Sequence, residues 1–447
     1  MHLSEFKQYA KELLNIAMPI IMGNLGFILI AAGDVLIAGR HSTDTLAAIS
    51  IATAISNCII TFGIGLVTSV SPVLSNYRGA KKSAKKYFYP TIRFAMFWAF
   101  IIMSAILAFV PLIDVMNFEA KLVPMIKEYM IITAFATFGG YLHAALKEYL
   151  QAFEIILFPN LVTVFSVFLN ILLNIILVFG FGPIPSLGVV GLAFASFIVR
   201  YFMGFALLIY CFKIMKFREY FNTKEYYKTL VKVGLPISFA VMIEFVAFNS
   251  IAVFMGQVSG VYAAAQNLVC TLTSISFMVP LAISNAIAVK VGFANGANNL
   301  VDLRRYAFIG MGIAVGFMAC SSIVFACIPD LLVKLFTSDD ALIKISVPVI
   351  YVLACFQVFD GLQVSLAGIF KGLKRTKIVM ITNFICFWLY FIPVGYTLAF
   401  KYNLMLLGFW CGLISAAILL CLILCIFLHK NLEEMRKSLN FISTDEF

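Results

Sequence analysis

Residues 19–48 read PIIMGNLGFILIAAGDVLIAGRHSTDTLAA, and this stretch decides the fold. Its apolar part is long enough to cross a bilayer, because about 20 apolar residues suffice. Asp34 nevertheless lies inside it, five residues before Gly39. An acidic residue at the centre of a spanning helix costs about 3 kcal/mol on insertion scales, so such residues usually face a watery cavity and bind something. We therefore interpret Asp34 as a residue that binds a cation.

The composition is that of a polytopic membrane protein. Of the 447 residues, 63% are hydrophobic and only 12% are charged, which no soluble domain of this length would combine. The net charge of +11 would suggest nucleic acid in a soluble protein. Here the lysines and arginines cluster between apolar segments, so orientation in the membrane explains them and no nucleic-acid partner is expected. The ten cysteines form no CxxC pair, and we expect no cofactor.

Twelve apolar segments alternate with charged or Gly-, Pro- and Asn-rich breaks. We predict an all-α membrane protein with twelve transmembrane helices. Their approximate spans are residues 13–38, 45–70, 88–112, 126–147, 158–180, 188–211, 230–255, 262–288, 306–329, 343–369, 378–400 and 405–428.

Basic residues concentrate in alternate loops. Only six of the 32 lysines and arginines fall in the opposite set of loops, namely Arg40, Lys121, Lys127, Lys334, Lys344 and Lys401. Cytoplasmic loops carry the excess of Lys and Arg, so both chain ends are predicted to be cytoplasmic.

The two halves of the chain repeat. Residues of the same type recur at a constant offset of 217 positions, as in Pro19 and Pro236, Gly39 and Gly256, Gly79 and Gly296, Phe153 and Phe370, and Gly191 and Gly408. One register held across six helices indicates an internal duplication. Because six is even, the copies share one orientation and are related by an axis along the membrane normal, with a transport path expected in a cleft between them.

This repeat predicts the domain organisation. Residues 1–212 form a six-helix bundle, and residues 232–430 form a second one. Residues 213–231 are a polar, amphipathic linker expected on the cytoplasmic leaflet of the membrane. Residues 431–447 are a polar cytoplasmic tail, expected to be loose.

Three polar residues of the first half are predicted to lie at one level. Asp34 lies five residues before Gly39, and Asn174 lies six before Gly180 in a helix that runs the same way. Asn170 is one turn from Asn174 on the same face. A carboxylate and two amide oxygens suit a small hard cation or a proton relay. The alternative is that these side chains only hold helices together.

The second half departs from this arrangement. The repeat partner of Asp34 is Ile251, and the partners of Asn170 and Asn174 are Phe387 and Phe391. Its acids within spans are Glu244 and Asp360 instead. Their depths, counted from the helix ends, differ by about 6 Å, so they are predicted to form a carboxylate pair if their helices face each other.

Two basic residues also fall within spans. Arg200 is mid-span, where pairing with an acid or carbonyl and a role in the cleft both stay open. Lys290 is interpreted as a helix-end residue that snorkels to the cytoplasmic surface.

These residues occur in motifs that resemble the multidrug and toxic compound extrusion (MATE) family, most closely its NorM-like branch. The motifs are MPIIMGNL, DVLIAGR and TLAA in the opening, YRGAKK, NILLN, LGVVGLAFAS, VGLPISFAVMIEF, YAAAQN and FDGLQVSLAGIFKGLKRTK. The resemblance implies two V-shaped six-helix bundles in the plasma membrane, the cytoplasmic (inner) membrane of a bacterium.

The resemblance also implies roles for the acids. Asp34, Asn170 and Asn174 match the cation and relay site of the N-terminal lobe. Glu244 and Asp360 match the cation site of the C-terminal lobe, which holds Na⁺ in some members. This chain departs at Phe356, one turn before Asp360, where the family pattern often has a tyrosine ligand.

We accordingly expect a non-enzymatic, monomeric exporter that exchanges small organic cations for Na⁺ or H⁺ by alternating access. Its other partners are membrane lipids. Drug and coupling ion would compete for Asp34, Glu244 and Asp360. The alternative is a flippase of lipid-linked oligosaccharides in the same superfamily, although such a cleft should carry several basic residues within its spans. A channel is disfavoured, since channels more often use a symmetric ring of residues.

Overall fold

A computed structural model describes residues 3–183, 185–214 and 223–444, so part of the predicted linker lies outside the described residues. Twelve helical segments of the described chain are long and apolar enough to cross a membrane, as predicted. The first half contains α1 (Leu3–His41), α2 (Thr43–Val67), α3 (Val70–Gly79), η1 (Lys85–Tyr87), α4 (Phe88–Phe109), η2 (Val110–Val115), α5 (Leu122–Ala152), α6 (Leu157–Phe179) and α7 (Gly188–Ile214).

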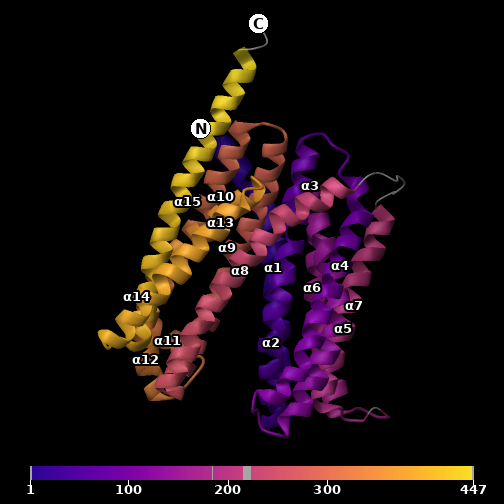
Figure 1. Cartoon of the computed structure of the whole chain (residues 1–447), viewed down its shortest axis with the longest axis vertical. Coiled ribbons are helices and arrows are strands. Elements are labelled where there is room, and N and C mark those ends of the chain that lie inside the picture. The colour runs from indigo at the N-terminus through magenta and orange to yellow at the C-terminus, as the bar shows by residue number, and fades with distance from the viewer. Residues whose placement is uncertain (1–2, 184, 215–222, 445–447) are drawn as a thin grey trace. The chain divides into compact units, whose positions relative to one another are not determined.

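The second half repeats this order (Figure 1). It contains α8 (Lys224–Val258), α9 (Gly260–Gly296), α10 (Leu300–Cys327), α11 (Pro329–Lys334), α12 (Asp340–Gly372), α13 (Thr376–Asn383), η3 (Phe384–Phe391), α14 (Ile392–Tyr396), η4 (Thr397–Lys401) and α15 (Met405–Thr444). Residues 376–401 form one candidate span, in which η3 and η4 are π-helical.

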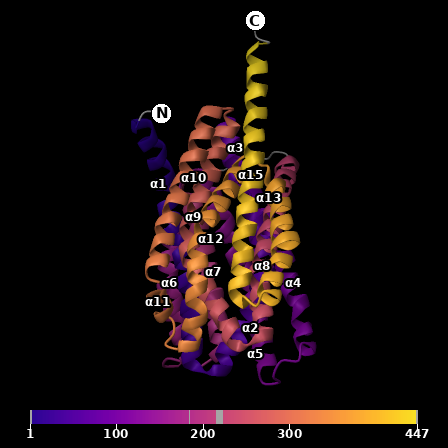
Figure 2. The same cartoon turned by 90° about the vertical axis from the view of Figure 1, so that its left-hand side faces the viewer.

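Several helices extend beyond their predicted spans, because hydropathy marks where a segment leaves the apolar layer and not where its helix ends. The expectation of a loose tail was wrong. The chain from Asn431 to Thr444 continues α15 as one helix (Figure 2). Leu432 is buried there, and His429 pairs with Glu433 one turn later at 3.2 Å. The tail is rich in good helix formers, so the helix continues after the apolar run has ended.

The chain forms two compact units. The N-unit comprises Pro19–Leu74 and Ser83–Ser238, and the C-unit comprises Met1–Met18, Ser75–Lys82 and Phe239–Phe447. The four-part division predicted from the sequence stays a prediction. The first part of α1, up to Met18, belongs to the C-unit, and the rest of the helix, from Pro19 onward, belongs to the N-unit.

Reciprocal contacts in the C-unit support the internal duplication. A Cβ atom on Gly79 would lie 1.9 Å from the carbonyl oxygen of Phe293, and one on Gly296 would lie 1.9 Å from that of Asn76. Asn76 and Phe293 are repeat partners at the same offset as Gly79 and Gly296. Such an exchange of contacts is what a local twofold axis produces. Glycine is required at both positions because the backbones approach so closely.

Small residues also bring α5 and α7 together in the N-unit. A Cβ on Gly139 would lie 2.7 Å from the backbone nitrogen of Tyr201, and one on Gly204 would lie 2.9 Å from the carbonyl oxygen of Gly139. Small residues are the usual means of close helix packing in membranes, where no hydrophobic force drives helices together. This contact places the Arg200 region of α7 directly against α5.

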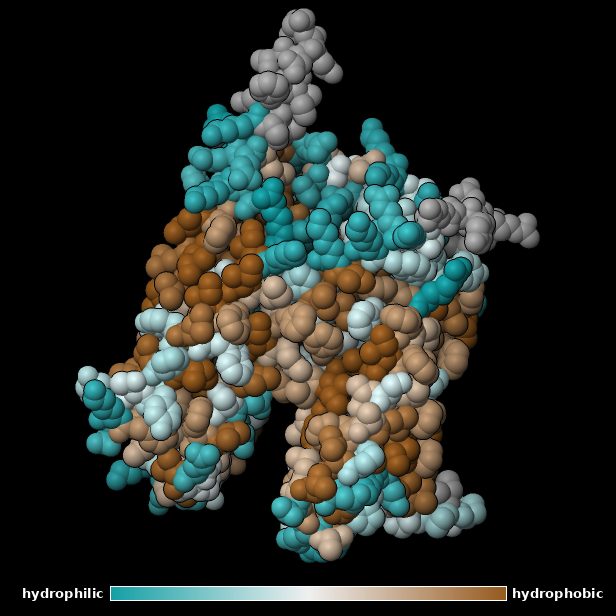
Figure 3. All heavy atoms as spheres, viewed as in Figure 1, coloured by the Kyte–Doolittle hydropathy of each residue, from teal (hydrophilic) through white to brown (hydrophobic). Residues whose placement is uncertain are grey.

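Apolar side chains cover the middle of each unit on the face shown in Figure 3, and hydrophilic residues lie toward the ends. On α6, for example, Phe168, Leu172 and Ile175 are each at least half exposed. Exposed apolar surface of this kind is expected only against lipid. The protein is therefore an integral membrane protein.

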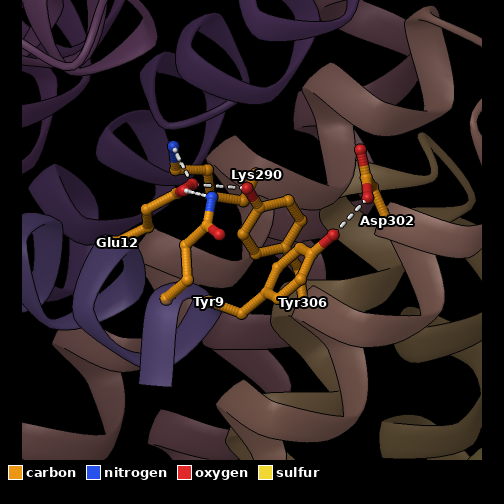
Figure 4. A network of polar contacts seen from close by, with 6 residues as sticks. Tyr9, Glu12, Lys290, Asp302 and Tyr306 are labelled. Carbon is orange, nitrogen blue, oxygen red and sulfur yellow. Dashed lines mark hydrogen bonds and ion pairs between the residues drawn. The ribbon is translucent and has the colours of Figure 1, made fainter. Parts of the chain in front are cut away.

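The start of α1 is anchored in the C-unit by a polar network (Figure 4). Lys290 Nζ lies 3.1 Å from Glu12 Oε2, and the Tyr306 hydroxyl donates to the same oxygen at 2.5 Å. Lys290 also lies over the ring of Tyr306. The interpretation of Lys290 as a snorkelling residue was therefore wrong, because its side chain is only 11% exposed and is paired.

A second part of the network continues along the same face of α1. The Tyr9 hydroxyl donates to Asp302 Oδ1 at 2.5 Å and accepts from Arg305 at 3.1 Å. Arg305 also pairs with Glu5 at 3.3 Å. Because Glu5, Tyr9 and Glu12 recur at helical spacing, a single face of α1 makes all of these contacts.

Candidate cation-binding sites

The first candidate site lies in the N-unit, where α1 and α6 meet. Asn174 Nδ2 donates to Asp34 Oδ1 at 2.6 Å and lies 3.1 Å from Asn170 Oδ1. Asn170 and Asn174 are fully buried. The structure thus brings together all three residues that the sequence placed at one level, although their role in binding a cation stays a prediction.

Three further residues complete the surroundings of Asp34. The Ser196 hydroxyl of α7 donates to Asp34 Oδ2 at 3.3 Å. Tyr129 of α5 is buried and lies within electrostatic reach of Asp34 and of Arg200. Arg200 is near enough for its positive charge to act on Asp34. The carboxylate is therefore held by hydrogen bonds from two helices, with a basic residue of α7 in its surroundings.

The amides of this site have unused hydrogen-bonding capacity. Among the described residues, Asn174 Oδ1 and Asn170 Nδ2 have no partner although both atoms are buried. Unpartnered buried polar atoms are uncommon and call for an occupant such as water or an ion. Asp34 Oδ1, Asn170 Oδ1 and Asn174 Oδ1 are oxygen ligands of the type that small hard cations prefer. The same carboxylate could instead take up a proton.

The second candidate site lies in the C-unit, between α8 and α12. Gln363 Nε2 donates to Glu244 Oε1 at 3.2 Å, and Gln363 is one turn after Asp360 on α12. Asp360 is buried and lies near enough to Glu244 for their charges to repel. The two acids therefore lie within electrostatic reach of each other, while a carboxylate pair and a Na⁺ site formed by them stay predictions.

Polar atoms near Asp360 are also left without hydrogen-bond partners. Gln363 Oε1 and both amide atoms of the fully buried Gln357 have no hydrogen-bond partner among the described residues. Two carboxylates and these amides offer oxygen atoms to a cation. Two acids within electrostatic reach of each other also favour uptake of a proton by one of them, since like charges repel in a medium of low dielectric constant.

The repeat partners of the first site are part of an apolar core. Ile251, Phe387 and Phe391 are fully buried. Phe356, which departs from the family pattern, is also in this core, with its ring 6.1 Å from Phe248 and 5.7 Å from Trp410. The two units therefore carry polar sites at different places, as the sequence predicted from the missing partners of Asp34, Asn170 and Asn174.

Sequence reasoning missed Ser196, Tyr129 and Gln363. Gln363 had a usable signal, because it lies three residues after Asp360 and so on the same helix face. Ser196 had a weaker one, since it is one turn from Arg200. The rotation of one helix against another decides whether such residues meet the carboxylate. The spacing of residues along a single helix does not reveal that rotation.

Comparison with known proteins agrees with this architecture. A sequence model of the MatE family matches residues 19–176 and again residues 236–397. The two matches begin at Pro19 and Pro236, which the internal repeat pairs. The duplication predicted from residue types is thus found independently.

Curated relatives match along almost the whole chain. The chain is 30% identical over 451 residues to a probable multidrug resistance protein NorM of Mesorhizobium japonicum, covering 95% of each chain. It is 26% identical to the protein of the same name from Acinetobacter baylyi, covering 95% of this chain and 97% of that protein.

Solved structures share the fold. The eukaryotic MATE transporter AtDTX14 superposes with a TM-score of 0.87 at 19% identity, covering 97% of this chain and 99% of that one. A MOP superfamily transporter of Pyrococcus furiosus superposes with a TM-score of 0.88 at 18% identity, covering 96% and 97%. The prediction of an all-α membrane protein with the MATE fold is confirmed.

Proposed function

The chain belongs to the MatE family, and we propose that it is a secondary active multidrug exporter that exchanges organic cations for Na⁺ or H⁺. The observation that carries this proposal is Asp34, a carboxylate in a membrane-spanning helix, hydrogen-bonded by Asn174 and Ser196. Intramembrane acids of this kind mark substrate and ion pathways. Relatives named as probable multidrug resistance proteins support export of drugs.

In the proposed mechanism, Asp34, Glu244 and Asp360 bind an organic cation that enters from the cytoplasm. The protein then opens to the outside, where Na⁺ or H⁺ binds the same carboxylates and releases the drug. The ion returns inward and is released to the cytoplasm. Exchange is obligatory because the drug and the ion need the same negative charges. The protein is proposed to act as a monomer in the plasma membrane of a bacterium, with both chain ends in the cytoplasm.

Proteoliposomes with separately imposed Na⁺ and H⁺ gradients test this proposal. A fluorescent organic cation such as ethidium should move against the direction of one of these gradients, and collapse of that gradient should stop it. Vesicles without protein give the passive rate. Ethidium transport that depends on neither gradient would overturn the proposal of secondary active exchange.

The same vesicles test the alternative of a lipid-linked oligosaccharide flippase. Such a protein should expose a labelled pyrophosphate lipid on the opposite leaflet without either gradient. This outcome, with no ethidium transport, would replace the proposed function.

A further inference from the structure

Arg200 stands out among the residues that the proposed mechanism leaves unused. It lies near the middle of α7, where a permanently charged guanidinium is costly to insert. The part of the chain that the structure describes offers this guanidinium no ion pair. Such a residue is expected to act on a nearby charge, and Asp34 and Tyr129 are within its electrostatic reach.

The geometry of α7 directs Arg200 toward the Asp34 site. Ser196 and Arg200 are four residues apart and therefore share one face of the helix. Ser196 contacts Asp34 Oδ2 at 3.3 Å. The Cα atom of Arg200 lies about 6 Å further along the helix axis than that of Ser196, which is about one turn. The side chain runs beside α5, since a Cβ on Gly140 would be in ordinary van der Waals contact with Arg200 Cδ at 3.7 Å.

The charges of this site balance without an added ion. Asp34 contributes one negative charge and Arg200 one positive charge. When an organic cation or a coupling ion binds Asp34, the site gains a second positive charge, which repels the guanidinium. Arginine has a long stem and can then withdraw its charged end from the carboxylate.

We propose that Arg200 is a tethered counter-cation of the Asp34 site, whose positive charge offsets that of the carboxylate without direct contact and opposes each cation that binds there. This inference rests on the proposed function. It assigns Arg200 a positioning and selectivity role. By competing with each passenger, Arg200 weakens binding enough for release.

Removal of the positive charge should tighten cation binding and slow release of the bound cation. For Arg200→Gln we expect ethidium to bind about tenfold more tightly, the change that corresponds to about 1.4 kcal/mol. Net efflux should fall severalfold. Arg200→Lys keeps the charge and should restore most of the net efflux.

The matched control is Arg93→Gln, which removes an exposed arginine of α4 in the same unit. It should leave ethidium affinity and net efflux unchanged. Affinity is measured by fluorescence on purified protein, and transport is measured in proteoliposomes.

The results separate this inference from the proposed function. If wild-type vesicles export ethidium but Arg200→Gln binds and exports it like wild type, the counter-cation role is overturned and the exporter stands. A folded Arg200→Lys protein that behaves like Arg200→Gln would also overturn it, because geometry rather than charge would then matter. If wild-type vesicles export no organic cation, the proposed function fails.

A folding readout covers the case in which Arg200→Gln does not fold. The double variant Asp34→Asn with Arg200→Gln removes both charges, so it should recover a monodisperse peak in size-exclusion chromatography. A double variant that is also unfolded would show that Arg200 supports the fold independently of Asp34 and would overturn the inference.

Discussion

The ion pair that anchors the start of α1 allows a quantitative prediction. Glu12→Gln removes the carboxylate 3.1 Å from Lys290 and leaves an ammonium group whose side chain is only 11% exposed. Breaking a fully buried pair from one side is destabilising by about 3–5 kcal/mol. The Glu12 side chain is 32% exposed, so water replaces part of its attraction. We therefore expect a smaller loss than for a fully buried pair, about 2 kcal/mol.

The assay is thermal unfolding of the detergent-purified protein, followed by tryptophan fluorescence. With about 2 °C for each kcal/mol in a large chain, the melting temperature should fall by about 4 °C. The control is Glu434→Gln, which breaks a pair with Arg375 at a similar distance of 3.3 Å between side chains that are 47% and 64% exposed. Exposed pairs contribute at most about 1 kcal/mol, so this shift should be within about 2 °C.

A double variant completes the test. Glu12→Gln with Lys290→Met removes both charges, so most of the lost stability should return, because no uncompensated charge is left behind. Equal shifts for Glu12→Gln and Glu434→Gln, or a double variant as unstable as the sum of its single changes, would refute the reasoning.

The remaining predictions concern the acids and the close contact of the repeats. Asp34→Asn and Asp360→Asn should each abolish ion-driven ethidium efflux while leaving membrane insertion intact, since the charge that both passengers need is gone; normal efflux by both variants would contradict the mechanism. Gly79→Ala should lower thermal stability by about 1–3 kcal/mol, because a Cβ there would lie 1.9 Å from the Phe293 carbonyl oxygen. Gly312→Ala, where a Cβ meets nothing within 4 Å, should not lower it; equal losses for both would mean that the close approach is unimportant.

The common level of Asp34 and Asn174 could be predicted because it depends on depth alone. Both helices run the same way, and each residue is a known number of positions from a glycine at or near the end of its helix. A constant rise of about 1.5 Å per residue then places the two side chains at one level. The repeat was predictable for a similar reason, since the same register holds along the whole chain.

Lys290 could not be placed from the sequence. Hydropathy put it near a helix end, where snorkelling is the ordinary behaviour of lysine. Its partner Glu12 is 278 positions away and belongs to the first half of the chain. The two charges meet because the start of α1, Met1–Met18, packs as part of the C-unit. A contact of this kind depends on three-dimensional packing, which the pattern of one helix does not encode.

The helical tail after Asn431 was missed for a different reason. The end of the apolar run predicts where the chain leaves the membrane, but it does not predict where the helix ends. Backbone hydrogen bonds continue wherever residues of good helix propensity follow. Leu432 and the His429–Glu433 pair are the local signals that the hydropathy argument passed over.

Competition at the carboxylates tests the central claim most directly. Binding of ethidium to purified protein should be measured by fluorescence while Na⁺ is raised at constant pH, and while pH is lowered without Na⁺. The account predicts that one of the two ions lowers the apparent affinity for ethidium without changing the maximum signal. It also predicts that Asp34→Asn combined with Asp360→Asn weakens ethidium binding without any competing ion and makes the remaining binding independent of both ions. Saturation binding that is indifferent to both ions in the wild-type protein would contradict it.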